Sequence, residues 1–103
     1  MINWHKDLYV DDNLIIDKKK IMKRIEKNKI TNGVFCITIA SNENNLLDII
    51  NANELLFDYY KRKSNYIVAL ASSRKSAIDL VALIVTDVYK KTGGYDVRRY
   101  FKV

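Results

Sequence analysis

The stretch that decides the fold is Val68-Ala69-Leu70-Ala71-Ser72, together with a similar stretch, Ile37-Thr38-Ile39-Ala40-Ser41, that precedes it by 31 residues. Each is a short apolar run that ends in Ala-Ser. Four polar residues follow each run, and a second apolar pattern then covers residues 46–50 in the first copy and 77–81 in the second. This spacing is typical of a strand followed by a helix, and two such units predict parallel strands joined by a right-handed crossover.

The spacing of apolar residues before the first copy predicts one more helix, and it also indicates that the first strand begins a few residues before Ile37. Residues 16–28 place Ile21, Met22 and Ile25 on one helical face, so this segment is expected to be an amphipathic helix. Residues 34–40 form a nearly continuous apolar run with β-branched members, which is typical of a strand covered on both faces.

The segments around the second copy are assigned in the same way. Residues 44–60 are helical by pattern with a bend near 51–53, and residues 75–91 predict a long helix that ends just before Gly93. Apolar and polar residues alternate over 95–103, which favours a final strand at the edge of the sheet.

Together these elements predict the fold class. We expect one α/β domain over residues 1–103, with residues 1–13 as an N-terminal arm and a small, largely parallel three-stranded sheet with helices packed on it. The two repeated βα units form its centre. A length of 103 residues with 49% hydrophobic and 29% charged residues is typical of one globular domain.

Composition also limits the compartment and the class of partner. Cys36 is the only cysteine, and the N-terminus lacks the apolar core of a secretory signal, so a cytoplasmic protein is expected. No apolar stretch approaches the roughly 20 residues that cross a bilayer, so no membrane role is predicted. A net charge of +6 favours anionic partners. A lysine-rich composition that simply follows from an AT-rich coding genome is the alternative source of this charge.

The residues that usually carry catalysis or bind metals are scarce. His5 is the only histidine and Cys36 the only thiol, and no Cys or His spacing resembles a zinc site. Neither a Walker loop nor a dinucleotide glycine fingerprint is present. The sequence therefore predicts no catalytic residues, no metal and no cofactor, and it leans away from an enzyme.

The best candidate for an anion-binding site is the turn after the second strand. It consists of Ser72, Ser73, Arg74, Lys75 and Ser76. Ligands of open α/β sheets bind beyond the carboxyl ends of strands, and an anion at a helix start would offset the unfavourable effect of Arg74 and Lys75 on the helix dipole. An ordinary capped helix start explains the same residues without a ligand.

The second candidate is a nucleic-acid contact on the predicted helix over 16–28. Its polar face gathers Lys19, Lys20, Lys23, Arg24 and Lys27. Basic residues of this kind contact phosphates, and Tyr59, Tyr60 or Tyr100 are candidates for base stacking. The basic runs at 61–63 and 98–99 would add to the positive surface. A solvated helix face is the simpler explanation.

A third possibility is an apolar surface that self-associates or binds another protein. The helix over 75–91 is apolar around most of its circumference, and Trp4 and Tyr9 lie in the N-terminal arm. Burial of both regions inside the domain is the alternative.

The chain as a whole resembles a group of small uncharacterised proteins of Firmicutes-type bacteria. The resemblance rests on residues 4–10 (WHKDLYV), 46–50 (LLDII) and 89–98 (YKKTGGYDVR). It implies no activity, cofactor or catalytic residue. From the residues themselves, the favoured function is a noncatalytic module that binds an anionic partner, either nucleic acid or a phosphate-bearing ligand. The alternative is a self-associating or protein-binding module whose charge is incidental.

Overall fold

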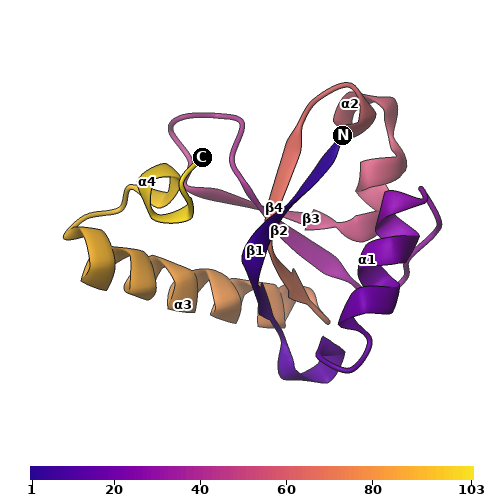
Figure 1. The fold of residues 1–103 in the computed structure, drawn as a ribbon, viewed down its shortest axis with the longest axis horizontal. Coiled ribbons are helices and arrows are strands. Elements are labelled where there is room, and N and C mark those ends of the chain that lie inside the picture. The colour runs from indigo at the N-terminus through magenta and orange to yellow at the C-terminus, as the bar shows by residue number, and fades with distance from the viewer.

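The computed structural model describes residues 1–103 and contains a four-stranded mixed sheet with helices on both faces (Figure 1). In chain order, the strands are β1 (Ile2–Val10), β2 (Phe35–Ile39), β3 (Leu47–Asn51) and β4 (Asn65–Ala71). The α-helices are α1 (Lys18–Glu26), α2 (Asp58–Lys61), α3 (Arg74–Thr92) and α4 (Val97–Phe101), and the 3-10 turns are η1 (Asp12–Leu14) and η2 (Ala52–Leu56). The strand order is β1-β4-β2-β3, and only β1 and β4 run parallel.

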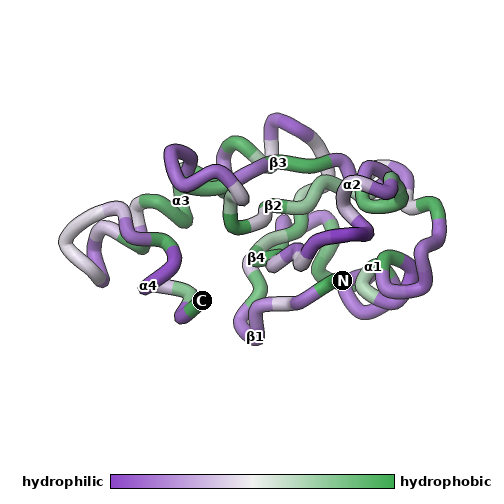
Figure 2. The backbone as a smooth tube through the Cα atoms, turned by 90° about the horizontal axis from the view of Figure 1, so that it is seen from above, coloured by the Kyte–Doolittle hydropathy of each residue, from purple (hydrophilic) through white to green (hydrophobic).

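Strand β4 lies at the centre of the core. Its residues from Ile67 to Ala71 are fully buried, and they divide between two apolar clusters on the two faces of the sheet. Ile67 and Leu70 pack with residues of α1 and η2, whereas Val68 and Ala69 pack with residues of α3 and α4. The resulting three layers are visible in Figure 2, where apolar residues run through β2, β3 and β4 between the helices.

The second copy of the repeated stretch forms the strand and helix that its sequence predicts. Strand β4 is followed directly by α3, whose first turn is capped by Ser73. Gly93 ends α3 with a φ of 76°, and its N–H donates to the Tyr89 carbonyl, as the glycine after a basic last turn predicts. Neither α3 nor any other helix has a segment long and apolar enough to span a membrane.

The first copy does not form a βα unit, and this part of the prediction is wrong. Strand β2 is present, but β3 follows it as an antiparallel hairpin partner where a helix was expected. The Asn42 side chain accepts from the Asn44 N–H at 2.9 Å, and the Asn45 N–H donates to the Asn42 carbonyl at 3.0 Å, so the connection is a tight turn. Residues 52–61 then form only short helical turns.

Both ends of the chain also differ from expectation. Residues 2–10, interpreted as part of an arm, form edge strand β1 beside β4. Residues 97–101, expected to be a strand, form α4, in which the Asp96 side chain accepts from the Arg99 N–H at 3.1 Å. Val97 and Phe101 are buried, and their spacing of four fits a helical face as well as an alternating strand. The largely parallel three-stranded sheet is therefore replaced by a mixed sheet of four strands.

Candidate functional site

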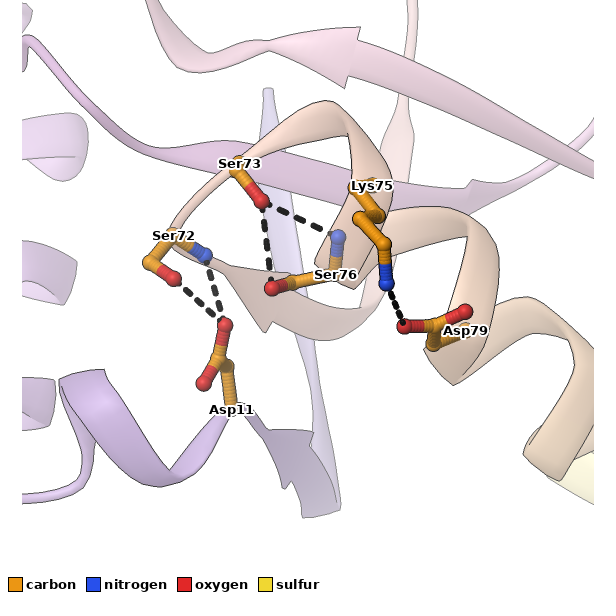
Figure 3. A network of polar contacts seen from close by, with 6 residues as sticks. All are labelled: Asp11, Ser72, Ser73, Lys75, Ser76 and Asp79. Atoms are coloured by element: carbon orange, nitrogen blue, oxygen red, sulfur yellow. Dashed lines mark hydrogen bonds and ion pairs between the residues drawn. The ribbon is translucent and has the colours of Figure 1, made fainter.

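The Ser72–Ser76 turn connects β4 to α3, as expected. The Ser73 hydroxyl oxygen accepts from the Ser76 N–H at 3.0 Å and lies 3.1 Å from the Ser76 hydroxyl, which makes Ser73 the N-cap of α3 (Figure 3). This cap satisfies one of the backbone donors that every helix start leaves without an intrahelical partner.

An anionic group of the protein itself already occupies the turn. The Asp11 carboxylate accepts from the Ser72 hydroxyl at 2.6 Å and from the Ser72 N–H at 3.0 Å (Figure 3). Its other oxygen accepts from the Asn13 N–H at 3.0 Å. The hydrogen bond from the Ser72 hydroxyl, followed by that from the Asn13 N–H, lowers the pKa of Asp11 to about 2. Asp11 is therefore ionised at neutral pH, and a ligand phosphate at Ser72 would meet a negative charge.

The sheet explains why sequence reasoning missed Asp11. Val10 at the end of β1 is paired with Leu70 in the parallel strand β4, so the residues that follow both strands meet at one edge. Reading residues 1–13 as an arm removed β1 from the sheet and Asp11 from that edge. The useful signal was the run of Asp11, Asp12 and Asn13 directly after an apolar Tyr9-Val10 pair.

The two cations of the turn do not converge on Ser72. The Lys75 ammonium lies 3.5 Å from Asp79 one helical turn away, and both side chains are largely exposed (Figure 3). The Arg74 guanidinium lies over the Phe35 ring, 5.7 Å from its centroid. The turn is thus a capped helix start held by Asp11, and its cations face other parts of the surface.

The basic face of α1 is located where the sequence places it. The helix predicted over 16–28 spans Lys18–Glu26, and its apolar residues Ile21 and Ile25 are buried. A shallow surface groove is lined only by basic residues, which are Lys19, Lys20, Lys23, Arg24, Lys27 and Lys29. We call this the α1 groove.

No cation of the α1 groove has an acidic partner. The only ion pair in the chain is Lys75 with Asp79, although the chain has 18 basic residues. Glu26, the last residue of α1, accepts a hydrogen bond from the Trp4 indole N–H at 2.9 Å. Asp17 directly precedes α1 and lines a neighbouring groove together with Lys20 and Arg24, but it forms no ion pair with them. The Arg24 guanidinium donates to the Ile30 carbonyl at 2.6 Å, which ties the loop after α1 to the helix. The groove is therefore a concentrated positive surface in which no cation forms an ion pair.

The other basic and aromatic candidates lie in different places. Tyr59 is exposed, and the Lys63 ammonium lies 4.7 Å and 5.0 Å from the ring centroids of Tyr59 and Tyr60. The Arg98 guanidinium donates to the Ala40 carbonyl in the domain itself, and α4 lies at the opposite end of the molecule from α1 (Figure 1). The basic pair at 98–99 is therefore not part of the α1 groove.

Tyr100 belongs to a half-buried hydrogen-bond network that the sequence did not reveal. The Tyr9 hydroxyl donates to Asp87 at 2.7 Å and lies 2.7 Å from the Tyr100 hydroxyl. Burial, together with these hydrogen bonds, raises the pKa of Tyr9 far above its usual value. The network joins β1, α3 and α4, and it leaves Tyr100 poorly placed for base stacking.

The single histidine and the single cysteine are packing residues in this arrangement. The His5 Nδ1 is 2.9 Å from the Tyr66 hydroxyl, the ring lies against Phe101, and burial lowers the His5 pKa. Cys36 is completely buried, and burial raises its pKa to about 12, so its thiol stays protonated. No group of three or more His, Cys, Asp or Glu residues is placed to hold a metal ion.

A scan against protein-family models and searches of the curated proteins and of the solved structures each found no match for this chain. The resemblance to small Firmicutes-type proteins therefore stays a prediction. The functional argument rests on the geometry of the chain itself.

Proposed function

We propose that this chain is a noncatalytic module that binds the phosphate backbone of a nucleic acid through the α1 groove. The observation that carries the proposal is the gathering of six basic side chains in one groove without an acidic partner. Phosphate contacts of this kind supply most of the affinity of sequence-independent nucleic-acid binding.

Repulsion within the groove favours a bound polyanion. Lys19 and Lys23, and Lys20 and Arg24, are spaced four residues apart on α1, and Lys27, which directly follows α1, has the same spacing from Lys23. Like charges at this spacing destabilise a helix by about 0.2 to 0.5 kcal/mol per pair. Phosphates beside them would replace repulsion with attraction, so binding is expected to stabilise α1.

The length of the groove favours a polymer over a single phosphate group. Lys19 and Lys27 are separated by about 12 Å along the axis of α1, because each residue adds about 1.5 Å. Duplex DNA carries about one negative charge per 1.7 Å of its axis, so several phosphates can face the groove at once. Contacts to phosphates carry no sequence information, so weak base preference is expected.

A small phosphate-bearing ligand at the Ser72–Ser76 turn is the less favoured form of this proposal. Asp11 already accepts both hydrogen bonds that Ser72 offers. A phosphate would have to displace this carboxylate or bind beside it, whereas the α1 groove requires no such exchange.

The test is a fluorescence-anisotropy titration of labelled single-stranded and double-stranded oligonucleotides with the intact chain at about 50 and about 200 mM salt. We expect saturable binding that weakens steeply with salt. A triple variant with Lys19→Gln, Lys23→Gln and Lys27→Gln should bind more weakly and, on duplex DNA, reduce the slope of log affinity against log salt by up to about 2.7.

A second triple variant provides the matched control. Lys75→Gln, Lys90→Gln and Lys91→Gln remove the same number of charges from α3, away from the α1 groove. This control should bind nearly as well as the unmodified chain. Absence of binding at the lower salt, or an equal loss in both triple variants, would refute the proposed groove.

A further inference from the structure

The α1 groove continues along the surface beyond α1. It shares Lys20 and Arg24 with a second groove, which lies between α1 and the segment from Ile30 to Val34. The second groove in turn shares Ile30 and Asn32 with a third, which extends over η2 to the start of α3. The third groove includes Asn51, Glu54, Phe57 and Arg74 in its lining, and we call it the Phe57 groove. One continuous path therefore leads from the cations of α1 to Phe57.

The two ends of this path differ in charge. The α1 groove is lined only by basic residues, whereas the Phe57 groove contains one acid, Glu54, and one cation, Arg74. Its apolar residues are Ile30, Leu56 and Phe57. Proteins that bind single-stranded nucleic acids combine a basic track for the backbone with aromatic side chains on which bases stack. The α1 groove matches the first requirement, and the Phe57 groove matches the second.

The Phe57 ring is available for such a contact. It is 60% exposed and belongs to neither apolar cluster of the core. The backbone of the same residue is held in place, because its N–H donates to the Glu54 carbonyl at 3.0 Å and its carbonyl accepts from the Tyr60 N–H at 3.0 Å. An exposed ring on a fixed backbone offers a face on which a base can stack. Ile30, which is 61% exposed, adds apolar surface in the same groove.

Hydrogen bonds fix the wall of the Phe57 groove. The Thr31 N–H donates to the Asn53 side-chain oxygen at 2.7 Å, and the Asn53 side-chain amide donates to the Asn32 side-chain oxygen at 2.8 Å. The Asn51 side-chain oxygen accepts from the Asn53 N–H at 3.0 Å. The remaining amide N–H groups of Asn32 and Asn51 have no acceptor within the chain and can donate to the edge of a base. A wall that is ordered before binding lowers the cost of binding.

We propose that the α1 groove and the Phe57 groove together bind a single-stranded nucleic acid, with phosphates along α1 and an unpaired base stacked on Phe57. This inference rests on the proposed function of the α1 groove and specifies the form of nucleic acid that it takes. Bases inside a duplex are stacked on one another, so a surface side chain does not reach their faces. The contact with Phe57 is therefore open to a single strand and closed to a duplex.

The test is a fluorescence-anisotropy titration of the intact chain and its Phe57→Ala variant with three labelled probes. These are a single-stranded oligonucleotide, the matching duplex, and an abasic strand of the same length that keeps the phosphates but lacks the bases. We expect Phe57→Ala to weaken binding of the single strand by about fivefold or more and to leave the other two affinities unchanged. The single strand is made as DNA and as RNA, and the version with the larger loss identifies the preferred polymer.

Two further variants at exposed aromatic positions serve as controls. Phe57→Trp keeps an aromatic ring and should retain the affinity for the single strand. Tyr95 is 58% exposed, but it lies in the loop between α3 and α4, at the opposite end of the molecule from α1 (Figure 1). Tyr95→Ala should therefore leave all affinities unchanged. Phe57 and Tyr95 are both exposed, so these variants are expected to fold, which circular dichroism checks.

This inference and the proposed function fail in different ways. The triple variant of Lys19, Lys23 and Lys27 should weaken binding of all three probes, because each of them carries phosphates. If it does so while Phe57→Ala binds the single strand as well as the unmodified chain, the α1 groove stands and the role of Phe57 is overturned. Equal losses of Phe57→Ala on the single strand and the abasic strand would overturn that role too. If no probe binds at low salt, both proposals fall.

Discussion

The two similar stretches, one ending at Ser41 and the other at Ser72, follow opposite paths after the same Ala-Ser pair. After Ser72 the chain enters a 19-residue helix that packs across the sheet, whereas after Ser41 it turns back as a hairpin. The contrast lies in the four residues that follow. After the second copy, Ser73 caps the helix, and Asp11, the residue that follows β1, anchors Ser72. After the first copy, Asn42 forms a turn. Apolar pattern alone does not choose between these outcomes.

The largest expected difference between the two copies lies in the burial of the element that follows each strand, which is α3 in the second copy and β3 in the first. Ile84 of α3 is completely buried, whereas Ile49 of edge strand β3 is only half-buried. We expect Ile84→Ala to lower the free energy of unfolding by about 3 to 4 kcal/mol and Ile49→Ala by about 1 to 2 kcal/mol. Urea denaturation measures both. Equal losses would show that the hairpin contributes as much to the core as α3 does.

The anchoring carboxylate should produce the next largest effect. Asp11→Ala removes the acceptor for Ser72 and Asn13, and we expect a loss of about 1 to 2 kcal/mol at neutral pH. The folded pKa of about 2 lies below the unfolded value of about 3.9, so this stabilisation is complete above about pH 4 and is lost as the pH falls through 2.

Urea denaturation at neutral pH and between about pH 4 and about pH 2 tests this prediction. The Asp11→Ala variant should lose less stability over the acid range than the unmodified chain. Asp12→Ala, which changes the exposed neighbouring carboxylate, provides the control and should leave the acid response unchanged. Identical acid responses in the Asp11→Ala variant and the unmodified chain would contradict a stabilising role for the Asp11 contact.

The smallest effect concerns the residue that directly follows each Ala-Ser pair. Ser73→Ala removes the N-cap of α3 and should cost about 1 kcal/mol. Asn42→Ala, at the matching position of the first copy, removes only one exposed side-chain bond within a turn and should cost less than about 0.5 kcal/mol. Thermal unfolding of the two variants compares them. A larger loss for Asn42→Ala would mean that the hairpin turn is the more critical of the two connections.

Sequence reasoning was accurate where one period was unambiguous and a stop signal was present. Helix α3 with its Gly93 terminus and the basic helix α1 are examples. It failed where a pattern of four apolar residues fitted both a strand and a helix, as in residues 95–103. It also failed where the result depended on which strands pair with one another. The contact between Asp11 and Ser72 joins residues 61 apart in the chain, and only the register of β1 on β4 brings them together.

The parallel pairing of β1 and β4 also imposes an order on folding. The β2–β3 hairpin joins neighbouring segments, so its loop closes at a small entropic cost, whereas β1 must wait for a strand that begins at Asn65. During synthesis, β1 therefore leaves the ribosome before the other three strands of the sheet, but it can pair only after β4 has been made. A nascent chain that ends before Asn65 contains neither β4, which pairs with β1, nor Ser72, which donates hydrogen bonds to Asp11. The N-terminal segment is then an unpaired, partly apolar strand for as long as the intervening residues are being made.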